Sequence, residues 1–475
     1  MDAAWMDLGY VVSAALFIFG LKKLGHPRTA PLGNTYGAFG MLVAVVTTVV
    51  KMGVDGGIHW ALIASGLLIG AAIGWVMAVR VEMTGMPEMV ALFNGFGGAA
   101  SALVAMSETW RWLEDSATIP AAGLELQVAV LAAGLSALVG WVTLTGSLLA
   151  MFKLKGGFKL LWVGPWIKTP TWGPSWLNGV KVLLLMSVFA MIGLQLAEPT
   201  NTSLMWGVIA VSCVIGVVLV LPIGGADMPV VVSLLNSLSG IAAAFTGFII
   251  GNSVLIVAGS LVGASGLILT FIMCKAMNRT LANVLFTSFG GSDKETVTRT
   301  KVGSDPDEVA MLLDGAQKVI IVPGYGMAVS QCQHQVKEFA DLLTEKFDTE
   351  VKYAIHPVAG RMPGHMNVLL AEANVPYEQL IEMDEINGEF PEADVALVIG
   401  ANDTTNPAAR GDVGPLAGMP ILDVDLARTV VIVKRSLSVG YAGVDNDLFY
   451  MDKSMMLYGD GKKMMTDLNN AIKEL

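Results

Sequence analysis

Nine apolar runs, each long enough to cross a lipid bilayer, occupy most of the first 280 residues of this chain. A bilayer core takes roughly 20 helical residues to cross, and inside it every backbone polar group must be paired within the structure. This half of the chain can therefore fold only as a bundle of membrane-spanning helices. We place the runs near residues 4–21, 35–52, 58–79, 87–107, 125–152, 178–196, 204–223, 228–250 and 253–277.

The basic residues between the runs predict how the bundle is oriented, because cytoplasmic loops carry an excess of Lys and Arg. With the N-terminus outside, one side of the membrane receives only Lys51 and Arg111. The other side receives eleven: Lys22, Lys23, Arg28, Arg80, Lys153, Lys155, Lys159, Lys168, Lys181, Lys275 and Arg279. An odd number of spans gives the same result, so we expect the C-terminal region in the cytoplasm.

Composition agrees with a membrane protein and excludes several other classes. Charged residues make up 15% of the chain, against roughly 25% in soluble domains. The net charge of −11 and the absence of a basic stripe argue against a nucleic-acid partner. The three cysteines, Cys213, Cys274 and Cys332, show neither a disulfide framework nor the spacing of a metal site.

The character of the chain changes near residue 289, where polar and charged residues replace the apolar runs. We read 1–280 as the membrane domain, 281–305 as a linker and 306–475 as a soluble domain. Apolar stretches at 319–324, 351–355, 394–400, 420–424 and 428–434 predict strands, and 331–347 and 367–373 predict helices. Strands that alternate with helices favour a doubly wound, Rossmann-like parallel sheet.

A glycine-rich loop follows the first predicted strand of the soluble domain. Residues 324–329 read GYGMAV, which is G-x-G-x-x-G with Val329 in place of the last glycine. In such a loop the first glycine permits a sharp turn and the second allows backbone to approach a pyrophosphate at a helix N-terminus. An ordinary strand–turn–helix joint is the alternative explanation.

Three further polar loops follow predicted strands, at 356–367, 400–409 and 434–441. Ligands of doubly wound sheets bind at the carboxyl ends of the strands. Lys434, Arg435 and Ser436 offer two cations and a hydroxyl, which suit a 2′-phosphate, although a solvated basic strand end is the alternative. Residues 353–361 contain no acid that could bind a bare ribose diol, so NADP(H) is favoured over NAD(H).

Taken together, the motifs resemble one protein family. GYGMAVSQCQ, AGRMPGHMN, GANDTTNPAA and KRSLSVGYAGV are similar to the NADP(H)-binding domain of proton-translocating NAD(P) transhydrogenases, and residues 226–279 resemble their membrane domain. The resemblance extends along essentially the whole β subunit of the bacterial enzyme. It implies hydride transfer from NADH to NADP⁺ coupled to proton movement across the bacterial inner membrane. It also implies NAD(H) bound by a separate α subunit with its own spans, in a dimer of heteromers.

The resemblance also assigns roles to residues. It places the pyrophosphate at the glycine loop and the 2′-phosphate at Lys434–Ser436, with Asp403 sensing the redox state of the cofactor as the catalytic coupling group. The loop 358–363 and Tyr441 close over the cofactor, and Asp460 lies at a further contact, where the family usually has alanine rather than Gly461. The full expected cofactor set is Gly324, Tyr325, Gly326, Met327, Ala328, Val329, Val358, Ala359, Gly360, Arg361, Met362, Pro363, Gly400, Ala401, Asn402, Asp403, Thr404, Lys434, Arg435, Ser436, Gly440, Tyr441, Asp460 and Gly461.

Polar residues within or beside the apolar runs are candidates for a proton path, because polar side chains at bilayer depth usually face protein or water. The expected path residues are Asn94, Asn236, Asp227, Ser239, Asn252 and Arg279. Contacts between helices are the alternative role for any one of them. Many family members carry a histidine at the position of Asn94, and asparagine cannot titrate. We therefore expect the titratable group to come from the α subunit, with polar residues that only hold water as the alternative.

A second functional class stays open on the sequence alone. A membrane transporter or channel with a regulatory nucleotide-binding domain would also join nine spans to a Rossmann-like domain. Such a protein would sense NADP(H) without turning it over. Turnover of NADP⁺ by NADH, and its response to uncouplers, distinguishes the two.

Overall fold

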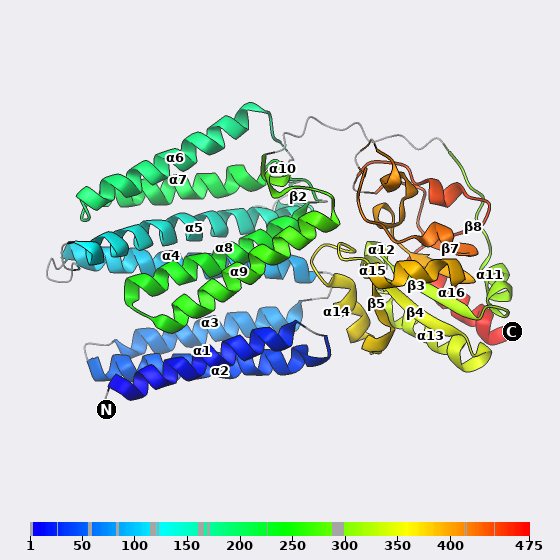
Figure 1. Cartoon of the computed structure of the whole chain (residues 1–475), viewed down its shortest axis with the longest axis horizontal. Helices are drawn as coiled ribbons and strands as arrows, with labels where there is room; N and C mark the ends of the chain where they lie inside the picture. Colours follow the sequence, from blue (N-terminus) through cyan, green and yellow to red (C-terminus); the bar gives the residue numbers. More distant parts are fainter. Residues whose placement is uncertain are drawn as a thin grey trace. The chain divides into compact units, whose positions relative to one another are not determined.

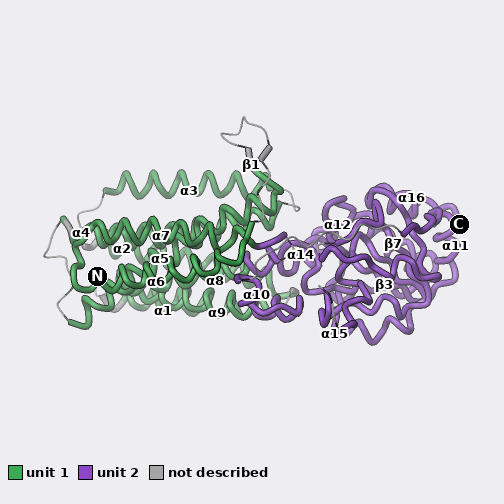
Figure 2. Tube along the Cα trace, turned by 90° about the horizontal axis from the view of Figure 1, so that it is seen from above, with its two compact units in different colours: residues 1–222, 232–268 green, residues 223–231, 269–475 purple. Residues whose placement is uncertain are grey.

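The structure, a computed structural model, describes residues 3–25, 27–55, 59–81, 85–114, 120, 123–159, 166–167, 169, 172–225, 227–286, 299–412, 414, 416–440 and 442–475. The chain forms two compact units (Figure 2). Unit 1 comprises residues 1–222 and 232–268, and unit 2 comprises residues 223–231 and 269–475. Unit 2 thus includes one end of each of the last two long helices together with the sheet domain. The functional division at residues 280 and 305 stays a prediction.

The predicted membrane helices are confirmed. Within the described part of the chain, nine helices have the length and apolar composition needed to cross a membrane. They are α1 (Ala3–Leu24), α2 (Ala30–Asp55), α3 (Trp60–Arg80), α4 (Met86–Glu114), α5 (Leu124–Leu154), α6 (Trp176–Ala197), α7 (Thr202–Val220), α8 (Met228–Ile250) and α9 (Ser253–Ala276). Several extend beyond the apolar runs, because a helix can continue into the polar interface.

Small residues allow the helices of unit 1 to pack closely. A Cβ added to Gly140 of α5 would lie 2.4 Å from the carbonyl oxygen of Gly98 in α4. A Cβ on Gly240 of α8 would lie 2.6 Å from the backbone nitrogen of Gly263 in α9. Backbones that approach this closely gain van der Waals contact that larger side chains would prevent. Glycine at positions 140 and 240 is therefore required by the close approach of two helices.

The remaining elements comprise short helices and eight strands within the described residues. Before the sheet domain these are η1 (Pro27–Thr29), the antiparallel pair β1 (Phe158–Lys159) and β2 (Trp166–Ile167), α10 (Leu281–Phe286) and α11 (Pro306–Leu313). The sheet domain contains β3 (Lys318–Pro323), α12 (Tyr325–Ser330), α13 (Gln333–Phe347), β4 (Glu350–Ile355), α14 (His365–Glu372), η5 (Tyr377–Gln379), β5 (Leu380–Glu382), α15 (Met383–Ile386), η6 (Asn387–Glu392), β6 (Val395–Ile399), η7 (Asp403–Thr405), η8 (Pro407–Arg410), η9 (Val424–Leu426), β7 (Thr429–Lys434), η10 (Asp447–Tyr450), β8 (Ser454–Tyr458) and α16 (Gly461–Glu474).

The six strands of the sheet domain are parallel and lie in the order β5-β4-β3-β6-β7-β8, covered by helices (Figure 1). Numbered within the domain this is 3-2-1-4-5-6, the order of doubly wound dinucleotide-binding sheets. The direction of winding reverses between β3 and β6, so the loops after these two strands border the crevice where ligands of such sheets bind. The predicted Rossmann-like fold is confirmed.

Buried side chains on both faces explain the near-continuous apolar sequence of the central strands. On one face Ile320 and Val322 of β3 share a core cluster with Phe390, Val424 and Phe449. The strand predicted at 420–424 is wrong, because residues 420–423 are irregular and Val424 begins the short helix η9. These residues are apolar because they pack onto the face of the sheet rather than pair within it.

Candidate functional site

The glycine loop after β3 packs against the carboxyl end of β6. Gly324 is extended, with φ −118° and ψ −177°, and its N–H donates to the Ile399 oxygen at 2.9 Å. A Cβ on Gly324 would lie 2.4 Å from the Ala401 nitrogen, and a Cβ on Gly326 would lie 2.5 Å from the Gly400 Cα. The Gly326 N–H donates to the Gly400 oxygen at 2.9 Å. Both glycines are therefore required by the contact between two backbones at the carboxyl end of the sheet.

The missing third glycine also has a physical explanation. Helix α12 has only six residues, and Val329 is an exposed side chain on it, while Met327 and Ala328 are buried. No close packing at Val329 calls for glycine. A Cβ on Gly461, at the start of α16, would lie 2.5 Å from the Ser330 Oγ, so Gly461 lies against the end of α12. Its predicted contact with the cofactor stays a prediction.

The loop at 356–365 is held by two buried histidines. His356 Nδ1 accepts the Val358 N–H at 3.2 Å, which leaves Nε2 to donate to the Pro420 oxygen at 2.9 Å. Burial lowers the pKa of His356 to about 4, so this histidine is neutral at physiological pH. The contact ties the end of β4 to a segment more than 60 residues away in sequence.

His365 holds the turn of the same loop next to the glycine loop. Gly360 has a φ of +106°, and a Cβ there would lie 2.5 Å from His365 Nδ1, which accepts the Arg361 N–H at 3.1 Å. The Arg361 guanidinium lies 4.5 Å from the centroid of the Tyr325 ring, within the range of a cation–π contact. Tyr325 and the predicted loop 358–363 are thus neighbours, and Ala359 and Met362 are buried beneath it.

Asp403 lies against the loop that follows β7. Its Oδ2 accepts the Ala442 N–H at 3.0 Å, and a Cβ on Gly440 would lie 2.2 Å from its Oδ1. Asn402 donates from Nδ2 to the Ser438 oxygen at 3.3 Å. The Thr404 oxygen accepts the Leu422 N–H at 2.9 Å. The loops after β6 and β7 are therefore held to each other by Asn402 and Asp403.

Lys434, at the end of β7, is a cation in a partly apolar setting. Its Nζ donates to the Ser438 oxygen at 3.0 Å and lies 4.3 Å from the centroid of the Phe449 ring. Burial lowers the pKa of Lys434 to about 8, although the nearby carboxylates of Asp403 and Asp445 oppose the shift. A desolvated ammonium of this kind gains from binding an anion.

Arg435 is the first residue after β7, and it contacts different partners from those of Lys434. Its Nη2 forms an ion pair with the Asp460 Oδ2 at 3.0 Å. Asp460 also caps α16, because its Oδ1 accepts the Lys462 N–H at 3.1 Å. Ser436 donates from Oγ to the Ser438 Oγ at 3.0 Å. Tyr441, the remaining residue expected in this loop, lies outside the described residues.

The expected proton-path residues of unit 1 do not share one environment. Asn94 is buried and donates from Nδ2 to the Val232 oxygen of α8 at 3.2 Å. Ser239 donates to the oxygen of Asn236, one turn earlier on α8, at 2.8 Å, and a Cβ on Gly97 would lie 3.7 Å from its Cβ. Asn94, Asn236 and Ser239 thus lie on facing parts of α4 and α8. Asn252 instead accepts the Leu255 N–H at 3.1 Å, a cap at the start of α9.

Asp227 and Arg279 belong to unit 2, at the ends of α8 and α9. Asp227 is 3% exposed, and burial raises the pKa of its carboxyl, opposed by the positive charge of Arg279. These two residues therefore interact electrostatically outside the apolar spans. The structure describes neither the N-terminal neighbour of Asp227 nor residues 287–298.

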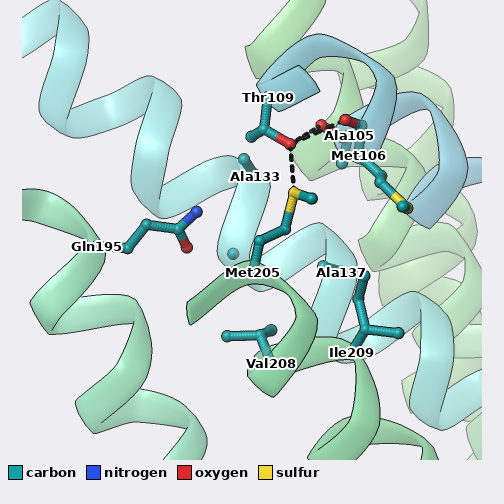
Figure 3. Close-up of a pocket in the computed structure, with 10 residues that line it drawn as sticks. Ala105, Met106, Thr109, Ala133, Ala137, Gln195, Met205, Val208 and Ile209 are labelled. Atoms are coloured by element: carbon teal, nitrogen blue, oxygen red, sulfur yellow. Dashed lines mark hydrogen bonds between the residues drawn. The ribbon is translucent and has the colours of Figure 1, made fainter. Parts of the chain in front are cut away.

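A small pocket in the helix bundle contains none of the expected site residues (Figure 3). It lies between α4, α5, α6 and α7, and its lining is mostly apolar. Thr109 Oγ1 donates to the Met106 oxygen at 2.9 Å and contacts the Met205 sulfur at 3.1 Å. The side-chain amide of Gln195 points into the pocket (Figure 3). The pocket therefore does not form part of the site assembled by the loops of the sheet.

Comparison with known proteins decides what this combination of units is. A family model described as NAD(P) transhydrogenase beta subunit matches residues 6–471. Two relatives from Rhodospirillum rubrum, both named NAD(P) transhydrogenase subunit beta, are 45% identical over 470 residues, which cover 98% of this chain and 98% of theirs. The chain belongs to the NAD(P) transhydrogenase β subunit family. Family and helices together make it a multi-pass membrane protein.

In this chain, the four loops expected from the sequence converge at the carboxyl end of the sheet. The glycine loop contacts residues 400–401, Tyr325 contacts Arg361, and Asp403 contacts the loop after β7. The roles assigned to the individual side chains stay predictions.

Sequence reasoning gave no role to several residues that build this site. His356 and His365 hold the loop after β4. Asn446 is fully buried and donates to both the backbone and side-chain oxygens of Asn402, at 3.0 and 3.2 Å. The histidines at the two ends of HPVAGRMPGH were the one visible signal in the sequence, and nothing in the sequence pointed to Asn446.

Proposed function

We propose that this chain is the NADP(H)-binding and proton-conducting β subunit of a proton-translocating transhydrogenase. NADH bound by an α subunit would reduce NADP⁺ held by this chain, and the reaction would be coupled to proton movement across the bacterial inner membrane. The observation that supports this best is the contact of the glycine loop with Gly400 and Ala401 of the loop after β6, at the switch point of a 3-2-1-4-5-6 sheet, in a chain of the β subunit family.

The residues at this edge suit a phosphorylated dinucleotide. Lys434, whose pKa is lowered by burial, would regain its full charge beside a 2′-phosphate. Arg435 would pair with the phosphate either in place of Asp460 or together with it. His365 Nε2 is buried, and no described residue accepts a hydrogen bond from it, so a polar partner at this point would be stabilising. Both features favour a polar, anionic ligand over an empty crevice.

When bound, the nicotinamide supplies the hydride chemistry, so no side chain need act as nucleophile or base. The chain's own residues position the cofactor and exclude water. The glycine loop and Tyr325 would orient the diphosphate end, Lys434 the ribose phosphate, and the 358–363 loop with Gly440 would cover the site. Asp403 would bias affinity between the oxidised and reduced forms through its negative charge.

Coupling to the proton would act through affinity. Moving one charge through ~200 mV supplies roughly 4.6 kcal/mol, which corresponds to a change in relative affinity of about 10³-fold. Linkage requires that bound NADP(H) alter proton affinity in return. Because Asn94 and Asn236 cannot titrate, we propose that spans of the α subunit supply the titratable group and that these side chains hold water beside it. The α subunit would join a dimer of such pairs, with the sheet domain in the cytoplasm.

Membranes that contain this chain and its α subunit test the proposal. They should reduce NADP⁺ with NADH, and an uncoupler should change the rate. Lys434→Ala should raise the KM for NADP⁺, whereas Lys337→Ala, which removes a surface cation paired with Asp341 on α13, should leave it unchanged. Bound NADPH without turnover would instead support a nucleotide-sensing transporter and refute the proposed reaction.

A further inference from the structure

The last part of the linker between the membrane helices and the sheet domain is docked onto β8, an edge strand of the sheet. Gly303 forms a parallel bridge with Met456 of β8, and Figure 1 shows this segment running beside that strand. The Ser304 N–H donates to the Met456 oxygen at 2.8 Å, and Tyr458 Oη donates to the Lys301 oxygen at 3.0 Å. A Cβ on Gly303 would lie 2.9 Å from the Tyr458 ring, so the strand edge and the linker fit closely.

Arg299 anchors the start of this docked segment. Its Nη1 lies 2.6 Å from the Asp447 Oδ1 and 3.8 Å from the Asp445 Oδ2, and its guanidinium carbon lies 3.7 Å from the centroid of the Tyr450 ring. Tyr450 Oη in turn donates to the Asp445 Oδ1 at 3.2 Å. The planar guanidinium of arginine can stack on a ring and pair with two carboxylates at once, and a lysine ammonium is a poor substitute for it.

From Asp445 a continuous polar network leads to the proposed phosphate-binding lysine. The neighbouring Asn446 donates to Asn402, Asn402 donates to the Ser438 oxygen, and the same oxygen accepts from Lys434 Nζ at 3.0 Å. Asp445 also acts on Lys434 directly through its negative charge. Every step between Arg299 and Lys434 is therefore a hydrogen bond, an ion pair, a charge–charge interaction or a single peptide step.

We propose that Arg299 is a positioning residue for NADP(H), through which the docking of the linker sets the affinity of the site. Arg299 holds Asp445 and Asn446, and these place Ser438 and Lys434 for the 2′-phosphate. The linker is the direct covalent connection between the last membrane helix and this domain, so a change at its membrane end reaches the cofactor site through this contact. The inference rests on the proposed binding of NADP(H) at Lys434.

The competing explanation is a surface ion pair of no functional consequence. The side chain of Arg299 is 50% exposed, and exposed pairs contribute little to stability. Arg428 provides a matched control, because its Nη1 pairs with Asp394 at 3.0 Å, its side chain is 80% exposed, and it precedes β7 at the amino edge of the sheet. Loss of either arginine removes one surface cation from the same domain, but only Arg299 connects to Lys434.

The test measures NADP⁺ and NAD⁺ dissociation constants of the full-length chain by calorimetry, and KM and kcat of the complex with its α subunit. Arg299→Gln should weaken NADP⁺ binding about 5-fold or more, in the range of typical coupling between sites, and should raise KM more than it lowers kcat. Arg299→Lys should recover only part of the loss. Arg428→Gln should match the wild type.

A double-mutant cycle decides whether the effect passes through Asp445. The effects of Arg299→Gln and Asp445→Asn on NADP⁺ affinity should be less than additive, as expected for residues in one network. Additive effects, or an Arg299→Gln affinity within twofold of wild type, would overturn the inference. A wild-type chain that does not prefer NADP⁺ over NAD⁺ would instead refute the proposed function itself, before any variant is compared.

Discussion

The affinity of this chain for NADP(H) should fall as the pH rises from 7 to 9. The reason is Lys434, whose pKa is lowered to about 8 by burial, with Asp403 and Asp445 opposing the shift. Only the protonated ammonium attracts a 2′-phosphate. With this pKa, Lys434 is about nine-tenths charged at pH 7 and about one-tenth charged at pH 9. If binding requires the charged form, the affinity decreases about tenfold over this range, or about 1.4 kcal/mol.

Titration calorimetry of NADP⁺ into the full-length chain in detergent, at half-unit pH steps, measures this decrease. The two histidines of the site do not interfere, because burial lowers the pKa of His356 and that of His365 to about 4. Lys434→Arg is the control: its guanidinium stays charged throughout, so its affinity should be independent of pH in this range whatever its absolute value.

Two results would refute this reasoning. Wild-type affinity that stays constant between pH 7 and 9 would mean that Lys434 is fully charged in the free protein or does not contact the phosphate. An equal decrease in wild type and Lys434→Arg would assign the titration to another group.

Three further predictions concern the sheet edge, the buried histidines and the membrane. Gly400→Ala should lower the melting temperature and weaken NADP⁺ binding, because Gly400 has a φ of +63° and its added Cβ would lie 2.3 Å from the Gly326 Cα, whereas Gly388→Ala, with open space around it, should do neither. His356 has a folded pKa below its unfolded value, so the unfolded state binds the extra proton and stability should fall as the pH drops from about 6.5 toward 4. The melting temperature should therefore differ less between pH 7 and pH 5 for His356→Gln than for the wild type. Asn236→Leu should abolish proton uptake by proteoliposomes, followed with a pH-sensitive dye, while NADP⁺ still binds; intact proton uptake would place the path elsewhere.

Much of the fold could be predicted because its strongest signals are local. A run of about 20 apolar residues has few ways to pair its backbone in a bilayer, so length and hydropathy suffice to predict each of the nine helices. Buried parallel strands read as continuous apolar runs, which is why β3, β4, β6 and β7 were found. The strands β5 and β8 were missed: β5 has three residues, and β8 is rich in methionine, which has no strand preference.

The candidate site was predicted in outline for the same reason and missed in detail. Glycines after a strand and cations at a strand end are visible in the sequence, and the structure places both at the carboxyl end of the sheet. The pairing of Arg435 with Asp460, 25 residues away, was not visible. Neither was the contact of His356 with Pro420. Such pairs join loops whose mutual position follows from strand order, and strand order is not written in any single segment.

By itself, then, the sequence determined that this chain spans a membrane, that its C-terminal third forms a parallel sheet, and that a glycine loop and two cations lie at strand ends. Only the tertiary structure decided that Gly326 packs on Gly400, that Lys434 and Arg435 contact different partners, and that Arg299 of the linker reaches Asp445. Local patterns reflect the solvent each residue must face or avoid. The contacts between loops depend instead on which strands are neighbours, and that is a property of the whole packed domain.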